Sequence, residues 1–140
     1  MKKAVIIYHS KTGITKKYAE EIGTYLKTKD LATDIVSIQE YGDDSIKNAD
    51  FLFLGCWTSG LMVFLQHPDK KWKEFTLKLP KEIKSKTALF TTYKLLTGSM
   101  FKNMRKQLGS KIDSCSTEIK SRKGLLSESD KVVLNSFIGK

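Results

Sequence analysis

The repeated alternation between short apolar runs and segments of helical periodicity constrains this chain more than any other feature of its sequence. Residues Ala4 to Tyr8 form the first run, which is apolar and mostly β-branched, as a buried strand requires. Apolar residues then recur at every fourth position from Ile14 to Leu26, which places them on one face of a helix. The same change from a strand pattern to a helix pattern occurs five times along the chain. This alternation predicts a parallel sheet with helices on both of its faces.

Two details of the pattern indicate where these elements lie. The central runs, FLFLG at 51–55 and ALF within 87–92, are continuously apolar, which is typical of strands that are covered on both faces. Ser127 followed by Asp130 is a capping-box pattern, so the last helix is expected to begin there and to bury Val133 and Phe137. The expected strands cover residues 4–8, 32–38, 51–55, 87–92 and 112–119, and the expected helices cover residues 14–26, 44–48, 68–77, a segment around 101–108 and the segment after 127.

The size and composition of the chain suit one domain over residues 1–140. No Pro/Gly/Ser-rich linker divides it, and no apolar run approaches the roughly 20 residues that a transmembrane helix needs. The apolar stretch at 4–7 is also shorter than the core of a secretory signal, which is about 7–15 residues long. We therefore expect a cytoplasmic protein, and we expect it to be a monomer.

The cysteine and histidine content argues against a disulfide framework and a metal centre. Cys56 and Cys115 form no CxxC pair, and His9 and His67 have no partner ligands at metal-binding spacing. The sequence also contains no recognisable set of a nucleophile with its base. We therefore expect no bound metal and no catalytic side chain, and we expect Cys56 to be a small buried residue.

The net charge of the chain is +10, from 25 basic and 15 acidic residues. A basic surface can attract nucleic acid, an anionic membrane or an acidic protein. Only two of the basic residues are arginine, which makes the bidentate contacts with phosphates and bases, and the lysines are spread over the whole chain. This pattern fits either a solvated lysine-rich surface or a preference for acidic partners. We expect neither nucleic acid nor a membrane among the partners.

The segment HSKTGIT, His9 to Thr15, joins the first strand to the first helix and is rich in hydroxyl groups. The free N–H groups and the positive dipole end of a helix favour an anion at this position. Gly13 allows the backbone to approach a ligand closely, and Ser10, Thr12 and Thr15 can each donate a hydrogen bond to a phosphate oxygen. The GxxxxGK[ST] and GxGxxG motifs are absent. The hydroxyls either cap the helix or hold a phosphate, and three of them around one glycine favour the phosphate.

These residues resemble the flavodoxin family. Residues Ser10 to Thr15 match the [ST]-x-T-G-x-T loop, which in that family holds the phosphate of flavin mononucleotide (FMN). The segment 51–60, FLFLGCWTSG, is similar to the third strand and the first loop over the flavin ring. The segment 87–101, TALFTTYKLLTGSMF, is similar to the fourth strand and the second such loop. The resemblance runs along the whole chain, to the short-chain kind, and implies an α/β three-layer sandwich with a five-stranded parallel sheet in the order 2-1-3-4-5.

The resemblance also implies which residues bind FMN. The loop 10–15 would hold the phosphate, and residues 56–61 would border the ring, with Gly60 near the flavin N5. Trp57 and Tyr93 are the aromatic residues expected to stack on the ring, although the first could instead lie at the rim of the site and the second could simply end a strand. The implied cofactor-binding residues are Ser10, Lys11, Thr12, Gly13, Ile14, Thr15, Cys56, Trp57, Thr58, Ser59, Gly60, Leu61, Thr91, Thr92, Tyr93, Lys94 and Gly98.

The basic charge is a departure from the family pattern. Flavodoxins typically surround the flavin with negative charge, which opposes the charge added on reduction and lowers the redox potential by Coulomb repulsion. Here Lys94 stands in a loop where the family is often acidic or glycine-rich. We therefore expect a less reducing flavin, and an acidic redox partner protein or an anionic substrate.

Three functions remain open at this point. The resemblance implies an electron carrier that moves electrons singly between redox partner proteins, with the flavin supplying the chemistry. An alternative is an FMN-dependent reductase of quinones or other small molecules, in which the apolar segment 61–67 would form part of a substrate pocket or a docking patch. A further alternative is a flavin-free binding module, because a fold does not determine a function. We favour the electron carrier over an enzyme.

Overall fold

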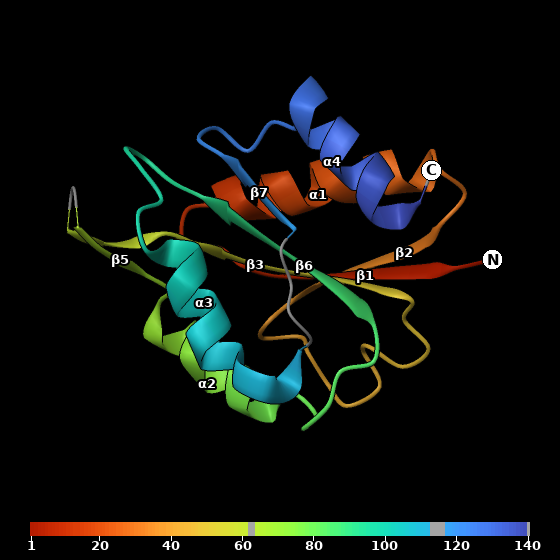
Figure 1. Cartoon of the computed structure of the whole chain (residues 1–140), viewed down its shortest axis with the longest axis horizontal. Coiled ribbons are helices and arrows are strands. Elements are labelled where there is room, and N and C mark those ends of the chain that lie inside the picture. The colour runs from red at the N-terminus through yellow and green to blue at the C-terminus, as the bar shows by residue number, and fades with distance from the viewer. Residues whose placement is uncertain (62–63, 113–116, 140) are drawn as a thin grey trace.

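The computed structural model describes residues 1–61, 64–112 and 117–139, and its central feature is a five-stranded parallel sheet (Figure 1). The strands lie in the spatial order β2-β1-β3-β6-β7, and each neighbouring pair is parallel. When only these five strands are counted along the chain, the order is 2-1-3-4-5, as expected. The strands are β1 (Lys3–His9), β2 (Ala32–Ser37), β3 (Phe51–Trp57), β6 (Lys86–Thr92) and β7 (Glu118–Ser121).

Helices cover both faces of the sheet, which gives three layers (Figure 1). Successive side chains of a strand point to opposite faces, so each central strand contributes to two separate apolar cores. Phe53 and Phe90 pack under the helices α1 (Ile14–Lys27) and α4 (Glu128–Ile138), whereas Leu54 and Leu89 pack under α2 (Lys70–Lys78) and α3 (Met100–Leu108). These are the helices of the described chain, and a short 3-10 turn, Gly109–Lys111, follows α3.

The capping box predicted for the last helix is present. The Asp130 N–H donates to Ser127 Oγ at 3.0 Å, and the Ser127 N–H donates to the Asp130 carboxylate at 3.2 Å. The helix then buries Leu134 and Phe137, while Val133 keeps 36% of its surface exposed. The prediction that Val133 is buried is therefore wrong. The cap fixes the start of α4. From that start, the helical repeat places Leu134 on the face toward the sheet and Val133 beside that face.

Two segments differ from the expected elements. Residues 44–48 form turns instead of a short helix, because their hydrogen bonds span three residues, as from the Lys47 N–H to the Asp44 carbonyl, and Asn48 has a positive φ of 62°. The fifth strand was expected at 112–119. Residues 113–116 lie outside the described residues, and the strand that the structure describes runs on to Ser121.

A small antiparallel hairpin was not predicted. It is formed by β4 (Ser59–Leu61) and β5 (Phe64–His67), directly after β3, and Figure 1 shows β5 at the margin of the molecule. Residues 62 and 63, which belong to the apolar segment expected to form a pocket or docking patch, lie outside the described residues. In the described ranges, no helix has the length and apolar character needed to cross a membrane.

The register of the sheet brings the carboxyl ends of its strands together. His9 pairs with Cys56, and Trp57 pairs with Thr92, which in turn pairs with Ser121. The loops that follow β1, β3, β6 and β7 therefore emerge at one edge. The chain crosses to opposite sides of the sheet after β1 and β3, and in such sheets ligands bind at this switch point, a rule for which the flavodoxin-like order is a standard example.

Candidate functional site

A cavity of about 350 Å³ lies at this edge of the sheet, within the range of about 300–1,000 Å³ that is typical of small-molecule sites. Its walls come from the loops after four parallel strands, far apart in sequence. Its lining residues are Lys11, Thr12, Ile14, Thr15, Trp57, Thr58, Ser59, Thr92, Tyr93, Lys94 and Arg122.

The N-terminus of α1 opens toward this cavity without a side-chain cap. Gly13 occupies the cap position in the left-handed region, with φ of 95°, and no side chain accepts a capping hydrogen bond there. The Ser10 hydroxyl accepts a hydrogen bond from the Gly13 N–H at 3.0 Å, so it closes the loop instead of capping the first turn. Thr12 lines the cavity and makes no hydrogen bond within the described part of the chain. The first turn also contains no acidic residue.

Threonine side chains join the loops beneath the cavity. The Thr15 and Thr92 hydroxyls lie 2.5 Å apart and link the start of α1 to the end of β6. The Thr91 hydroxyl donates to the Cys56 carbonyl at 2.6 Å and also lies 2.8 Å from the Thr58 hydroxyl. These contacts fix the spacing of the loops after β1, β3 and β6.

Two aromatic side chains stand on opposite loops of the cavity. Trp57 ends β3 and Tyr93 follows β6, and both are half-buried. The Lys11 ammonium lies over the Trp57 ring, 4.8 Å from its centroid, and the Lys120 ammonium lies 5.7 Å from the Tyr93 centroid. Each ring therefore already accepts a cation on one face, a favourable electrostatic contact.

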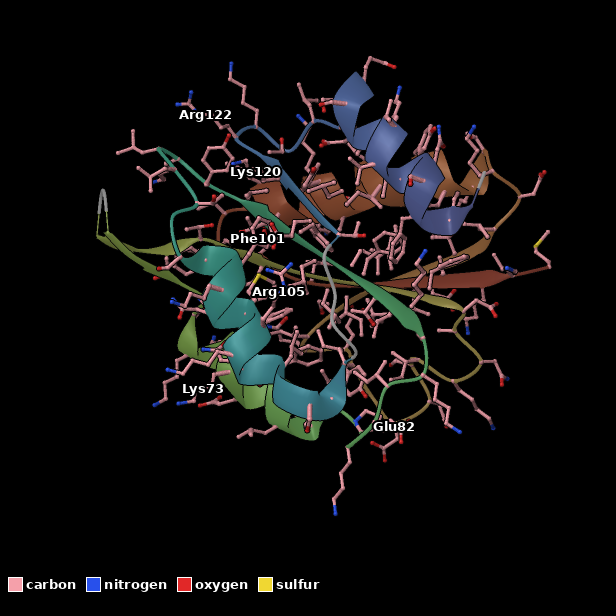
Figure 2. The ribbon with its side chains drawn as sticks, in the orientation of Figure 1. Lys73, Glu82, Phe101, Arg105, Lys120 and Arg122 are labelled. Carbon is pink, nitrogen blue, oxygen red and sulfur yellow. The ribbon has the colours of Figure 1, made fainter. Side chains whose placement is uncertain are left out.

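The lining of the cavity is positively charged. Lys11, Lys94 and Arg122 contribute three cations, and no acidic residue is among the described residues that line it. Arg122 follows β7 (Figure 2), and its Nε donates to the Lys94 carbonyl at 3.1 Å, which joins the loops after β6 and β7. Sequence reasoning missed Arg122 because it ended the fifth strand at Ile119. A strand that runs to Ser121 would have placed Arg122 at the carboxyl edge.

A partly buried hydrogen bond between His9 and Asp69 lies behind the Trp57 wall. The His9 Nε2 lies 2.6 Å from the Asp69 carboxylate, which also caps α2 by accepting the Lys71 N–H at 3.2 Å. The Trp57 indole faces the same carboxyl group but forms no hydrogen bond of good geometry with it. Burial by itself raises the pKa of Asp69, but the hydrogen bonds from His9 and Lys71 outweigh it and lower the pKa below its usual value.

The predicted site residues fall into several groups. Cys56 and Thr91 are fully buried behind the wall, and burial raises the pKa of the Cys56 thiol well above its usual value. Gly98 lines a different cavity, and the side chain of Leu61 is not described. Ser10 and Gly13 belong to the loop after β1 without lining the cavity, and Gly60 lies in β4. The lining residues that were predicted are Lys11, Thr12, Ile14, Thr15, Trp57, Thr58, Ser59, Thr92, Tyr93 and Lys94.

Solved structures of known proteins share this fold. The two-electron reduced flavodoxin of Megasphaera elsdenii matches with a TM-score of 0.79 at 21% identity, over 98% of this chain and 99% of that chain. Flavodoxin 1 of Bacillus cereus matches with a TM-score of 0.72 at 17% identity, over 97% of this chain and 95% of that chain. A mutant Fusobacterium nucleatum flavodoxin, bound to flavin mononucleotide, matches with a TM-score of 0.62 at 16% identity, over 100% of this chain and 95% of that chain.

Sequence comparison gives the family. No curated protein matches the chain in sequence. A family model described as a flavodoxin domain matches residues 5–119, which is most of the chain and includes the loops after β1, β3 and β6. The chain belongs to the flavodoxin family.

Proposed function

We propose that this protein binds one FMN non-covalently in the cavity at the carboxyl ends of the strands, and that it carries electrons between partner proteins. The observation that carries the proposal is the uncapped N-terminus of α1, which opens on a cavity between Trp57 and Tyr93. Such a terminus suits a phosphate, and aromatic walls suit a planar ring. The flavodoxin that is described as bound to flavin mononucleotide supports the choice of cofactor.

The residues of the loop fit a phosphate. The first turn of α1 offers backbone N–H groups without a capping side chain or an acid to compete for them. The Thr12 hydroxyl and the Lys11 ammonium stand beside this terminus in the cavity wall. This set of donors suits a dianion, and it would hold the phosphate of FMN by charge-assisted hydrogen bonds.

The residues around the ring position suit binding and orientation rather than catalysis. When bound, the flavin supplies the redox chemistry, and the protein supplies orientation and electrostatics. Cys56 is buried and its thiol has a raised pKa, so it is a poor nucleophile. Lys94 and Arg122 favour negative charge in the cavity. These features support a carrier whose partner supplies or accepts the electrons.

The carrier role is tested by rapid mixing of the reduced, FMN-loaded protein with two cytochromes of similar potential, one acidic and one basic. We expect faster reduction of the acidic cytochrome, because the chain carries a net charge of +10. Raising the ionic strength should slow this reaction, since salt screens the attraction. Preference for the basic cytochrome at low salt would contradict the proposed acidic partner.

A second assay separates a carrier from an enzyme. Steady-state turnover with reduced nicotinamide and a quinone should be slow relative to electron transfer to the cytochrome. Rapid, saturable quinone turnover would instead identify a small-molecule reductase and overturn the carrier proposal.

A further inference from the structure

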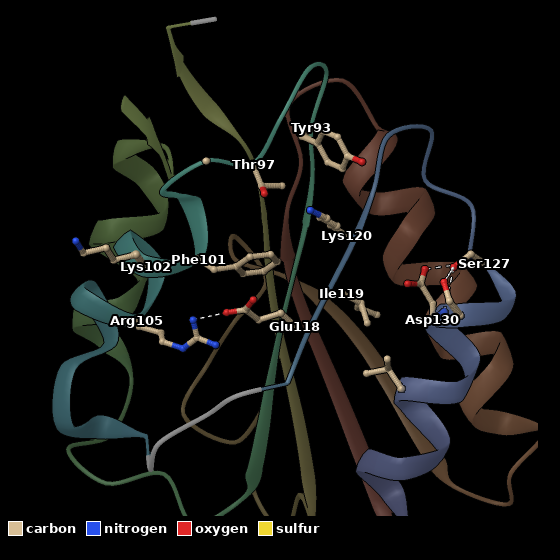
Figure 3. Close-up of a pocket in the computed structure, with 13 residues that line it drawn as sticks. Tyr93, Thr97, Phe101, Lys102, Arg105, Glu118, Ile119, Lys120, Ser127 and Asp130 are labelled. Carbon is tan, nitrogen blue, oxygen red and sulfur yellow. Dashed lines mark hydrogen bonds and ion pairs between the residues drawn. The ribbon is translucent and has the colours of Figure 1, made fainter. Parts of the chain in front are cut away.

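A second cavity, of about 580 Å³, lies along the outer edge of β7 and outside the proposed flavin site. Figure 3 shows it between α3 on one side and α4 on the other, with β7 between them. Tyr93 lines this cavity as well as the proposed flavin site, so the two share one wall. We name this second cavity the edge groove.

The backbone of β7 faces the edge groove with unused hydrogen-bonding groups. β7 pairs with β6 on one side, where the Leu89 N–H donates to the Thr117 carbonyl and the Tyr93 N–H donates to the Ser121 carbonyl. Because backbone groups alternate in direction along a strand, those of Glu118 and Lys120 point away from β6. Within the described part of the chain, these outward groups have no hydrogen-bond partner. An exposed strand edge of this kind is a template for another strand.

The side of the groove toward α3 is polar and positively charged. Glu118 forms an ion pair with Arg105 of α3, so its charge is compensated (Figure 3). Lys120 is exposed, and its ammonium contacts the Tyr93 ring without an acidic partner among the described residues. Lys102 stands on the rim, and its side chain points outward in Figure 3.

The side of the groove toward α4 presents one partly exposed apolar residue, Val133, beside the polar residues Ser127, Ser129 and Asp130. Ile119 alternates with its charged neighbours and joins the core under α1 and α4. Val133 of α4 lines the groove with 36% of its surface exposed. Asp130 also lies on this side, but it is buried and accepts hydrogen bonds from the Tyr18 hydroxyl at 2.8 Å and from the Ser127 N–H. Its charge therefore has internal partners.

We propose that the edge groove binds an extended acidic segment of a partner protein, which adds to β7 as a further strand. Its backbone pairs with Glu118 and Lys120, and its side chains alternate between two faces. On the α3 side acidic residues meet Lys120, and on the α4 side apolar residues pack against Val133. A second copy of this chain suits the groove less well, because each copy carries a net charge of +10.

This inference goes beyond the proposed function, because the groove does not require a flavin. Since Tyr93 lines both cavities, a segment in the groove would also hold its protein next to the flavin site. A lysine on an edge strand can also serve only to prevent edge-to-edge association. That role predicts no specific affinity for an acidic strand, so the two explanations differ in a binding experiment.

The test uses nuclear magnetic resonance of the labelled protein with a short, end-blocked synthetic peptide of alternating glutamate and valine. We expect shifts at the Glu118 and Lys120 amides and at the Val133 methyl groups, and slower amide exchange at Glu118 and Lys120. Two control peptides carry N-methyl groups on the glutamates or on the valines. One of them should bind more weakly than the other, because only one set of backbone groups faces β7.

Two variants with the same change of charge complete the test. Lys120→Glu should weaken binding of the peptide by about fivefold or more, because an exposed charge pair contributes about 1 kcal/mol. Lys73→Glu, on α2 and away from the groove (Figure 2), should leave the affinity unchanged. The proposal would be overturned if the two methylated peptides bound equally well, or if both variants lost peptide affinity to the same extent. It would also be overturned if the peptide shifted the resonances of Trp57 and not those of the groove. A dimer formed through β7, detected by sedimentation, would overturn it in favour of a second copy.

Discussion

At the scale of single residues, Thr12 is the residue of the loop after β1 whose hydroxyl remains available for the proposed phosphate contact. Thr15 is hydrogen-bonded to Thr92, and Ser10 accepts the Gly13 N–H, whereas Thr12 has no partner in the described chain. Thr12→Val should weaken FMN binding by roughly 10- to 100-fold, because a hydrogen bond to a charged group contributes about 1.5–3 kcal/mol. Fluorescence titration of the flavin measures the loss.

The matched control for this variant is Thr24→Val. Thr24 is exposed on the same helix, on the side away from the core, so the change in chemistry is the same and the site is untouched. Riboflavin binding should be equal in both variants, since riboflavin has no phosphate. A similar loss of riboflavin affinity in Thr12→Val would show that the substitution disturbs the loop and not the phosphate contact.

The second prediction at this scale concerns Lys94 and the potential of bound FMN. Its charge lines the cavity, and its backbone carbonyl holds Arg122, a contact that survives a change of side chain. Lys94→Gln should lower the midpoint potential by about 10–40 mV, which corresponds to about 0.2–1 kcal/mol for an exposed charge. A redox titration measures this, with Lys78→Gln on α2 as the control. An unchanged or raised potential in Lys94→Gln would contradict the electrostatic account.

Single residues were the hardest feature to predict. The stripe that begins at Ile14 is correct for the later turns of α1, but Ile14 itself is 39% exposed and lines the cavity. Cys56 and Thr91 were expected at the ring and lie behind the wall. Periodicity identifies an apolar face, but it cannot tell which member of a stripe reaches beyond the sheet. The resemblance supplied contiguous segments, but alternate residues of a strand point to opposite sides, so only some members of each segment reach the cavity.

At the scale of elements, the contact between α1 and α4 depends on two tyrosines that differ in their acceptors. Tyr18 donates to the Asp130 carboxylate at 2.8 Å, and Tyr25 donates to the Asn135 amide oxygen at 2.7 Å. Burial, together with the Asp130 charge and this hydrogen bond, raises the pKa of Tyr18 well above its usual value, so it stays protonated.

Replacing each tyrosine by phenylalanine isolates these hydrogen bonds. Tyr18→Phe should lower the free energy of unfolding by about 1.5–3 kcal/mol, because it removes the buried donor to a carboxylate. Tyr25→Phe should cost only about 0.5–1.5 kcal/mol, since its acceptor is neutral. Urea denaturation measures both values. A larger loss of unfolding free energy in Tyr25→Phe than in Tyr18→Phe would contradict these roles of the two hydrogen bonds.

The Asp69 contact predicts a pH dependence of stability. The pKa of Asp69 is lowered in the folded protein, so its stabilisation is complete above the unfolded value of about 3.9 and is lost as the pH falls through the folded value. Asp69→Asn keeps a good helix cap but removes the charge that His9 contacts. The variant should be less stable than the original at pH 7, and the difference should shrink below about pH 4. An equal loss of stability in Asp69→Asn at pH 7 and below pH 4, measured by urea denaturation, would contradict this pH dependence.

The elements themselves were largely predictable, for a physical reason. Buried parallel strands and amphipathic helices carry strong signals in the sequence, and the central strands contain the apolar runs FLFL, at 51–54, and ALF, at 88–90. The hairpin of β4 and β5 carries no such signal because its strands contain only three and four residues. Residues 44–48 were expected to form a short helix, but Asp44, Ser45 and Asn48 favour turns, and the hydrogen bonds there close after three residues.

At the scale of the whole molecule, the strand order followed from the family resemblance, and the parallel arrangement followed from the alternation of elements. The charge of +10 was visible in the sequence, but its arrangement was not. Only the fold brings Lys11, Lys94 and Arg122 around one cavity, because they follow three different strands. The edge groove also depends on the fold, since it needs α3 and α4 on opposite sides of β7.

The central claim is that the uncapped start of α1 holds the phosphate of FMN. The most direct test is to titrate FMN and riboflavin separately into the flavin-free protein and to compare their dissociation constants. The account predicts saturable binding of one FMN per chain and much weaker binding of riboflavin, by at least about tenfold for a lost charge-assisted contact. Equal affinity for the two flavins, or no binding of either, would contradict it, because the terminus of α1 would then have no role in holding a phosphate.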